Sequence, residues 1–221
     1  MIKGVIFDLD GVITDTAEYH YLAWKNLADS QGWKFDREAN EELRGVSRMD
    51  SIRLIARNNS IDLSEDEMVQ FATAKNEIYV KSLENISPDD YLPGAEELLK
   101  RIKDAGLKIG LGSSSKNARP VLKKLQAEQY FDMIGDGNSV NVSKPDPGIF
   151  LFGASELGLD PSECIVFEDA ESGIDAALAG GFPCVGIGPE ERVGHATVRF
   201  DDMNSASFDE IAEFFAISQQ V

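Results

Sequence analysis

The chain has 221 residues, of which 21 are basic and 39 acidic, so its formal net charge is −18. Hydrophobic residues make up 43% and charged residues 27%, a balance typical of a folded globular protein with a real core, which argues against wholesale disorder. The negative charge argues against a nucleic-acid binder and against binding to an anionic membrane, because both need clustered Lys and Arg. It also poses a question for any phosphate substrate, which the protein as a whole should repel.

No run of about 18 apolar residues is present, so we expect no transmembrane helix. The first apolar run meets an acid at Asp8, too early for a secretory signal peptide. Cys164 and Cys184 each lie in or beside an apolar run, and both histidines are far away in the sequence. This pattern favours two buried thiols over a metal site and predicts a cytoplasmic protein.

The first expected strand covers residues 5–7, and a long stretch without strands follows it. Residues 14–86 contain no convincing strand. Asp15 and Glu18 have the spacing of a capping box, with Asp in place of Ser or Thr, and apolar residues recur behind them at helical spacing. Further helices are expected near residues 37–44, 49–58 and 64–83.

Beyond Pro93, short apolar runs alternate with segments of helical period. The helical segments end at glycines, and Asp146 followed by Pro147 supplies one helix start. Most of the apolar runs lack polar alternation, as expected for strands covered on both faces. The expected helices are 94–105, 147–157 and 171–179, and the expected strands are 107–111, 165–167 and 185–187.

This alternation predicts an α/β fold with a doubly wound, Rossmann-like parallel sheet, interrupted by an all-helical insert. We expect a core domain formed by residues 1–13 and 88–221. The helical domain is expected to cover residues 14–87.

The strongest chemical signal is the pair of acids, Asp8 and Asp10, at the end of the first expected strand. Period-2 geometry places both on one side of an extended chain, and Gly11 then provides a turn. In open α/β sheets, ligands bind beyond the carboxyl ends of the strands. One acid could merely end a strand, but a pair followed by glycine favours a chemical site.

Polar residues follow other expected strands in the same way. The run Ser113–Asn117 opens a helix, where hydroxyls and backbone N–H groups favour a phosphate, although serine-rich turns are common without one. Glu168 and Asp169 follow a buried strand and offer hard oxygen ligands that suit Mg²⁺. Lys144 precedes Pro145, which disfavours helix and holds the lysine in a loop.

In combination and in this order, these motifs resemble the haloacid dehalogenase superfamily. They are Asp8-x-Asp10, Ser113, Lys144-Pro145 and Glu168-Asp169. The helical insert is similar to the cap domain of that superfamily. A further resemblance, to its β-phosphoglucomutase subfamily, covers essentially the whole chain and weakens after about residue 190. The segments that carry it are Thr14–His20, Ala23–Trp24, Leu43–Arg48 and Ala74–Tyr79.

The resemblance implies an aspartyl-phosphate mechanism. Asp8 would be the nucleophile that takes the phosphoryl group, and Asp10 the general acid and base. One Mg²⁺ per chain would be held by Asp8, Asp169, Glu168 and a carbonyl of Asp10. It would offset the repulsion between Asp8 and phosphate, about 4 kcal/mol for one pair of unit charges at about 4 Å and an effective dielectric of about 20.

The transferring phosphate would be cradled by Lys144, Ser113 and the Ser114 backbone. A mutase also needs a second phosphate grip, because its bisphosphate intermediate turns round before donating the other phosphate. By resemblance Arg48 provides that grip, since a planar guanidinium suits bidentate phosphate binding. The same site would be completed by Ser115, Lys116 and Asn117.

The resemblance assigns Thr16, His20 and Lys75 to a hinge set that links cap closure to the placement of Asp10. It also implies that Lys75 contacts the sugar or its phosphate. On the residues alone, Arg48 and Lys75 could instead be solvated surface cations, and Trp24 could fill a helix interface. Ala170 stands where the subfamily commonly has Ser, so no metal role is expected there. The remaining residues that the resemblance assigns to the substrate site are Trp24, Gly45, Val46, Ser47 and Ser51.

The activity implied by the resemblance is interconversion of β-D-glucose 1-phosphate and D-glucose 6-phosphate through β-glucose 1,6-bisphosphate, which also serves as activator. The alternative is a sugar-phosphate phosphatase with the same core and water as acceptor. A third alternative is a non-catalytic binding or regulatory protein on this fold. It predicts loss of Asp8, Asp10, Lys144 or Asp169, and all four are present. The expected partner is a small hexose phosphate, with no nucleic acid and no membrane, and the charge favours a monomer.

Overall fold

The strands form one parallel sheet in the computed structural model, which describes residues 1–217. The sheet has the order β3-β2-β1-β4-β5-β6, and its neighbouring strands pair in parallel. The strands are β1 (Gly4–Phe7), β2 (Lys108–Gly112), β3 (Met133–Gly135), β4 (Cys164–Glu168), β5 (Cys184–Ile187) and β6 (Val198–Phe200). The winding direction reverses between β1 and β4, as in doubly wound sheets, which confirms the predicted fold class.

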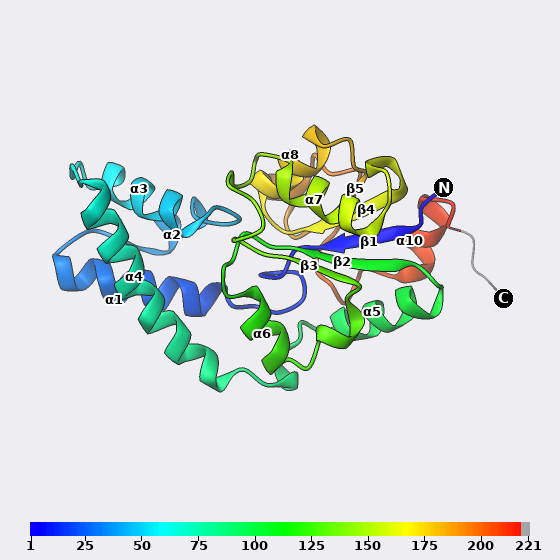
Figure 1. The fold of residues 1–221 in the computed structure, drawn as a ribbon, viewed down its shortest axis with the longest axis horizontal. Helices are drawn as coiled ribbons and strands as arrows, with labels where there is room; N and C mark the ends of the chain where they lie inside the picture. Colours follow the sequence, from blue (N-terminus) through cyan, green and yellow to red (C-terminus); the bar gives the residue numbers. More distant parts are fainter. Residues whose placement is uncertain (218–221) are drawn as a thin grey trace.

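Helices cover both faces of this sheet (Figure 1). The helices on one face are α5 (Ala95–Asp104), α6 (Ala118–Lys124) and α10 (Phe208–Phe214). The helices on the other face are α7 (Gly148–Leu157) and α8 (Glu171–Ala179), and the short α9 (Glu190–Val193) follows β5. Short 3₁₀ turns cover Leu83–Asn85, Pro88–Asp90, Glu128–Tyr130 and Pro161–Glu163.

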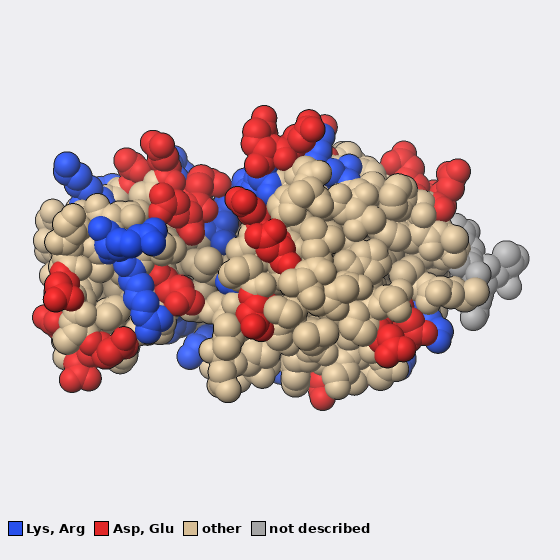
Figure 2. Space-filling model, turned by 90° about the horizontal axis from the view of Figure 1, so that it is seen from above, with Lys and Arg blue, Asp and Glu red and all other residues tan. Residues whose placement is uncertain are grey.

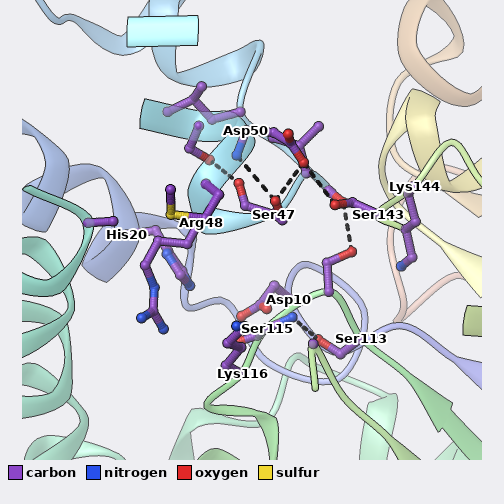
Figure 3. Close-up of a pocket in the computed structure, with 18 of the residues that line it drawn as sticks. Asp10, His20, Ser47, Arg48, Asp50, Ser113, Ser115, Lys116, Ser143 and Lys144 are labelled. Atoms are coloured by element: carbon purple, nitrogen blue, oxygen red, sulfur yellow. Dashed lines mark hydrogen bonds between the residues drawn. The ribbon is translucent and has the colours of Figure 1, made fainter. Parts of the chain in front are cut away.

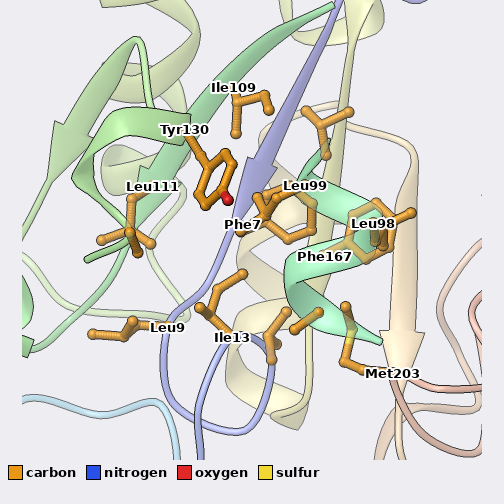
Figure 4. Close-up of a cluster of buried hydrophobic side chains, with 14 of the residues drawn as sticks. Phe7, Leu9, Ile13, Leu98, Leu99, Ile109, Leu111, Tyr130, Phe167 and Met203 are labelled. Carbon is orange, nitrogen blue, oxygen red and sulfur yellow. The ribbon is translucent and has the colours of Figure 1, made fainter. Parts of the chain in front are cut away.

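The central strand β1 is buried on both faces, which explains its lack of polar alternation. Phe7 packs against Phe167 of β4, with ring centroids 4.7 Å apart, and against the cluster that contains Leu98 and Leu99 of α5 (Figure 4). Ile6 points the other way and joins a second cluster that includes Phe150 of α7. Because neither face meets water, both positions are apolar.

Four helices form a separate layer beside the carboxyl ends of the strands, and we call them the helical part (Figure 1). They are α1 (Ala17–Gln31), α2 (Arg37–Glu41), α3 (Arg48–Asn58) and α4 (Glu65–Ser82). They enclose a small core of their own that contains Trp24, Ile52 and Ala72. The chain connects this part to the rest, the sheet part, twice, and the two connections meet where the Thr14 hydroxyl donates to the Asp90 carbonyl (2.6 Å). The exact domain boundaries at residues 13/14 and 87/88 stay a prediction.

The start of α1 differs from the expected capping box. Asp15 accepts a hydrogen bond from the Ala17 N–H (3.0 Å), while Thr16 occupies the cap position without a side-chain cap bond. Glu18 pairs with Arg37 of α2 instead of reaching back to the helix start (2.8 Å). The acids were correctly placed at a helix start, but the reciprocal bonding pattern was wrong, because a guanidinium nearby is a stronger partner for Glu18 than a backbone N–H.

Most other elements agree with the sequence-based prediction to within one to three residues, and two edge strands were missed. β3 and β6 have three residues each, too short to show a period. Asp146 accepts from the Gly148 N–H (2.8 Å), so it marks the start of α7 as predicted, although the helix begins one residue after Pro147.

Acidic side chains are scattered over both parts of the molecule on the face shown in Figure 2, without forming one continuous patch. Both cysteines are buried and free, as predicted. None of the helices within residues 1–217 combines the length and apolarity that crossing a membrane requires.

Candidate active site

Four acidic residues meet at the carboxyl ends of the two central strands. β1 leads into Asp8 and Asp10, and β4 ends at Glu168, just before Asp169. Because the two strands pair in parallel, the residues that follow them lie side by side. Oxygens of Asp8, Glu168 and Asp169 lie within 4.8 Å of one another, close enough to share one cation.

Two glycines make room for these carboxylates. Gly11 adopts a left-handed conformation (φ +85°), and a Cβ there would lie 2.3 Å from Oδ2 of Asp169. A Cβ on Gly173 would lie 2.0 Å from Oε1 of Glu168. The cluster of hard oxygen donors therefore fits Mg²⁺. The Asp10 carboxylate lies outside this cluster, and the predicted ligation through its carbonyl stays a prediction.

Lys144 lies in the loop before α7 and is the cation at the centre of this cluster. Its Nζ donates to Oδ1 of Asp8 (2.6 Å) and to Oε1 of Glu168 (2.5 Å), and its side chain is fully buried. Burial alone would lower the pKa of Lys144, but the two carboxylates raise it above its ordinary value. Lys144 thus stays charged and neutralises part of the negative field at the point where a phosphate would approach Asp8.

Asp10 differs from the other acids in having an unpaired oxygen. Its backbone N–H donates to Oδ2 of Asp8 (3.0 Å), whereas its own Oδ1 is buried and has no hydrogen-bond partner among residues 1–217. Burial, reinforced by Asp8 and Asp169, raises the pKa of Asp10 well above its ordinary value. The side chain is therefore suited to carry a proton, as a general acid must.

A cavity of about 810 Å³ separates these residues from the helical part. It is within the size range of small-molecule sites. The structure brings nearly all of the predicted site residues to its wall. They are Asp8, Asp10, His20, Trp24, Gly45, Val46, Ser47, Arg48, Ser51, Lys75, Ser113, Ser114, Ser115, Lys116, Asn117, Lys144 and Asp169. Thr16 and Glu168 are not in its wall; both are fully buried, Glu168 behind Lys144.

Hydrogen bonds between the two parts close the rim of this cavity. The Ser114 hydroxyl donates to the Gly45 carbonyl (2.9 Å), and Asn117 Nδ2 donates to Asn76 Oδ1 (2.9 Å). A third hydrogen bond between the two parts runs from the Ser143 hydroxyl to Oδ2 of Asp50 (2.8 Å) (Figure 3). The helical part is therefore held against the sheet part through polar groups that lie next to predicted site residues.

Buried Lys75 and half-buried His20 form a polar pair inside the helical part, next to the Tyr79 ring. Lys75 Nζ donates to Nδ1 of His20 (2.7 Å) and lies 4.9 Å from the Trp24 ring centre. Burial, and then repulsion from Arg48, lowers the pKa of Lys75 to about 7. Burial and Lys75 lower the pKa of His20 well below its ordinary value. Neither residue is a solvated surface group, which removes the alternative left open for Lys75.

Lys75→Met is expected to stabilise the protein, most strongly near neutral pH and below. Between about pH 7 and the ordinary value of 10.5, the unfolded chain binds a proton that folded Lys75 does not, so wild-type stability rises with pH. Methionine removes this buried charge, and we expect a gain on the order of 3 kcal/mol in the free energy of unfolding at pH 6.5.

The gain should shrink as the pH approaches 10. Urea unfolding at pH 6.5, 8 and 9.5 measures it, and Lys81→Met, at an exposed position of the same helix, is the matched control. A constant difference between wild type and Lys75→Met at all three pH values would contradict the account.

Several residues at the site were not found from the sequence. Arg44 donates to Oδ2 of Asp169 (2.9 Å), and Asp50 and Ser143 join across 93 positions of sequence. Ser47 caps α3 by accepting from the Asp50 N–H (3.2 Å), a spacing the sequence does show. That signal predicts the helix start only, because nothing local indicates which distant side chain will meet Asp50.

Comparison with known proteins agrees with this geometry. The family model of haloacid dehalogenase-like hydrolases matches residues 2–181. A β-phosphoglucomutase of Bacillus subtilis (strain 168) is 43% identical over 189 residues, which cover 85% of this chain and 84% of that protein. A crystal structure of a β-phosphoglucomutase from Clostridium difficile superimposes with a TM-score of 0.94 at 44% identity, covering 98% of each chain.

Phosphatases are also among the relatives. A fructose-1-phosphate phosphatase of Escherichia coli (strain K12) is 32% identical over 184 residues, which cover 83% of this chain and 95% of that protein. Mutases and phosphatases thus share this fold, so the fold alone does not choose between them.

Proposed function

The chain belongs to the haloacid dehalogenase-like hydrolase family, and from that premise we propose that it is a β-phosphoglucomutase. It interconverts β-D-glucose 1-phosphate and D-glucose 6-phosphate through β-glucose 1,6-bisphosphate and a phosphorylated enzyme. One observation carries the proposal beyond the names of the relatives. The same cavity has Lys144, which contacts Asp8, on one side and Arg48 on the other (Figure 3), and Lys116 also lines it, so the cavity offers cations for two phosphates.

Asp8 is the nucleophile in this proposal. Its carboxylate is oriented by the Asp10 N–H at one oxygen and by Lys144 at the other. Attack on phosphorus forms an acyl phosphate on Asp8 and releases the sugar oxygen. Because the Lys144 cation is already in contact with Asp8, part of the charge repulsion is compensated before the phosphate arrives.

Asp10 is the general acid and base. Its buried carboxyl favours the protonated form, which can protonate the departing sugar oxygen as the phosphoryl group moves to Asp8. The resulting carboxylate then accepts the proton of the hydroxyl that attacks phospho-Asp8 in the return step. Since one group performs both transfers, the proton count balances over the cycle.

Asp8, Glu168 and Asp169 would hold one Mg²⁺, whose oxygen ligands and distances they fit. When bound, Mg²⁺ supplies positive charge that stabilises the transferring phosphoryl group. The role of the bisphosphate as activator follows from the reaction, because an enzyme that has lost its phosphoryl group must be rephosphorylated before it can act again, and β-glucose 1,6-bisphosphate can donate that group.

Arg48 is the second phosphate grip. It begins α3 and lines the cavity together with Ser115, Lys116 and Asn117 at the start of α6. Its guanidinium is half-buried, yet none of the carboxylates of residues 1–217 is within salt-bridge distance of it. A half-buried arginine without an acidic partner is well placed to bind an anion.

A sugar-phosphate phosphatase is the second candidate, because phosphatases of about 30% identity share this core. A phosphatase needs the Asp8 side of the cavity but no grip on a second phosphate. Arg48 therefore separates the two functions.

Arg48→Ala is expected to lower mutase kcat/KM by about two to four orders of magnitude, because two charge-assisted hydrogen bonds of about 1.5–3 kcal/mol each are lost. Hydrolysis of acetyl phosphate, which has no second phosphate, should change less than about threefold on the same reasoning. Coupled assays of both activities measure the split, with Arg57→Ala, exposed on the same helix, as control. Equal losses in the two assays would count against the mutase.

A further inference from the structure

Two arginines and two acids join the helical part to the sheet part around Asp169. Arg44 Nη1 donates to Oδ2 of Asp169 (2.9 Å), and Arg44 Nε donates to Oε2 of Glu41 (2.8 Å). Arg192 Nε donates to the Asp169 carbonyl (2.6 Å), and its Nη1 reaches the same Glu41 oxygen (3.5 Å). We call these four residues, Glu41, Arg44, Asp169 and Arg192, the charge ring.

The charge ring is not an ordinary surface ion pair. The Asp169 side chain is 7% exposed and that of Arg44 is 25% exposed, whereas pairs fully in water contribute little. Arg44 and Asp169 also line both the large cavity and a second cavity of about 290 Å³ behind it. They therefore form part of the wall between the two cavities.

The backbone at Arg44 and Gly45 contacts the sheet part through hydrogen bonds that do not involve the Arg44 guanidinium. The Ser172 hydroxyl donates to the Arg44 carbonyl (3.3 Å), and the next carbonyl, of Gly45, accepts from Ser114. Gly45 has φ +72°, and a Cβ there would lie 2.6 Å from the Ser172 hydroxyl oxygen. Arg44 therefore lies beside Asp169 whenever this loop of the helical part packs against the sheet part.

We propose that Arg44 is a positioning residue that couples docking of the helical part to the cation affinity of Asp169. This inference rests on the proposed Mg²⁺ site. Paired with Arg44, the Asp169 carboxylate has one oxygen occupied and its charge partly neutralised, so it attracts a divalent cation less strongly. By linkage, a cation held at Asp169 weakens the Arg44 contact to the same extent and favours undocking.

The coupling gives the site a way to exchange substrate. A bisphosphate intermediate has to turn round between two chemical steps, and this requires the helical part to loosen its grip. A cation held at Asp169 weakens the charge ring. The docked state of the helical part therefore does not become too stable for the intermediate to turn round. The contacts of Ser114, Asn117 and Ser143 remain to restore docking.

Arg44→Gln tests the proposal on the full-length chain, with Arg37→Gln as matched control. Arg37 is exposed, and among residues 1–217 it contacts Glu18 and Tyr21, both within the helical part. Calorimetric titration with MgCl₂ should show three- to tenfold tighter Mg²⁺ binding for Arg44→Gln and no change for Arg37→Gln. Small-angle scattering should show a larger radius of gyration for Arg44→Gln, and KM for β-glucose 1-phosphate should rise more than kcat falls.

Arg44→Lys keeps the charge but cannot hold Glu41 and Asp169 at once, so its Mg²⁺ affinity should lie between wild type and Arg44→Gln. It also provides the test if Arg44→Gln does not fold. Mg²⁺ affinities of the Arg44 variants that equal or fall below that of wild type would overturn the inference. A wild-type chain that binds no Mg²⁺ would overturn the metal site itself, so the two failures are distinguishable.

Discussion

Asp8→Asn is expected to lower kcat of the mutase reaction by at least about four orders of magnitude, because an amide cannot form the acyl phosphate on which both half-reactions depend. The substitution keeps the size of the side chain. Its one oxygen can still accept from Lys144, which contacts Oδ1 of Asp8, although the hydrogen bond from the Asp10 N–H to Oδ2 is lost. Because Lys144 also keeps Glu168 as a partner, loss of activity should not reflect loss of the fold.

Two measurements separate chemistry from folding in this variant. Incubation with radiolabelled β-glucose 1,6-bisphosphate should label wild type and leave Asp8→Asn unlabelled, while the circular dichroism spectra should coincide. Asp175→Asn, an exposed position on α8 paired with His195, is the isosteric control and should keep full activity. Labelling of Asp8→Asn at wild-type level would show that another residue is the nucleophile.

Lys144→Met is expected to lower the free energy of unfolding by about 3–5 kcal/mol without added metal, because removing one partner leaves buried charges without compensation. Lys144, Asp8 and Glu168 have side-chain exposures of 0%, 8% and 0%. The same change should reduce activity severely, since the cation that offsets repulsion between Asp8 and phosphate is gone.

Urea unfolding in EDTA measures the loss, and Lys123→Met, at an exposed position of α6, is the control. Adding Glu168→Gln to Lys144→Met removes one of the two stranded charges. The double variant should recover a substantial part of the lost stability, because residues in one network do not act additively. A cost below about 1 kcal/mol for Lys144→Met would mean that the cluster is not charged as described.

The sheet and its acids were predictable because they depend on local patterns. The apolar β1 followed by Asp8 and Asp10 identifies a buried strand with candidate catalytic acids at its carboxyl end. The parallel pairing of β1 and β4 places Glu168 beside these acids. Glycines after periodic segments identified the ends of α5, α7 and α8. These features need only a few consecutive residues, so one sequence is enough.

Other features depend on contacts that no local pattern encodes. Glu18 meets Arg37 instead of its own helix start, and Arg44 meets Asp169 across 125 positions. β3 and β6 are three-residue edge strands whose pairing is decided by the rest of the sheet. The assignment of Arg48 to a phosphate came from resemblance to a family, because a single arginine has no signature of its own.

The net charge of −18 is compatible with a phosphate substrate because the local charges differ from the global one. Lys144 lies inside the acidic cluster, and Arg48 and Lys116 line the same cavity. Most other acids lie on the surface, where water and salt screen them. Binding of a phosphate substrate therefore depends on the cations that line the cavity and not on the net charge of the whole chain.

The central claim is that this chain moves a phosphoryl group between two positions of one sugar. The most direct measurement supplies the wild-type protein with β-glucose 1-phosphate, MgCl₂ and a trace of β-glucose 1,6-bisphosphate, and follows glucose 6-phosphate and inorganic phosphate together. We predict stoichiometric formation of glucose 6-phosphate, dependent on the bisphosphate and abolished by EDTA. Release of inorganic phosphate without glucose 6-phosphate would contradict the account and identify a phosphatase.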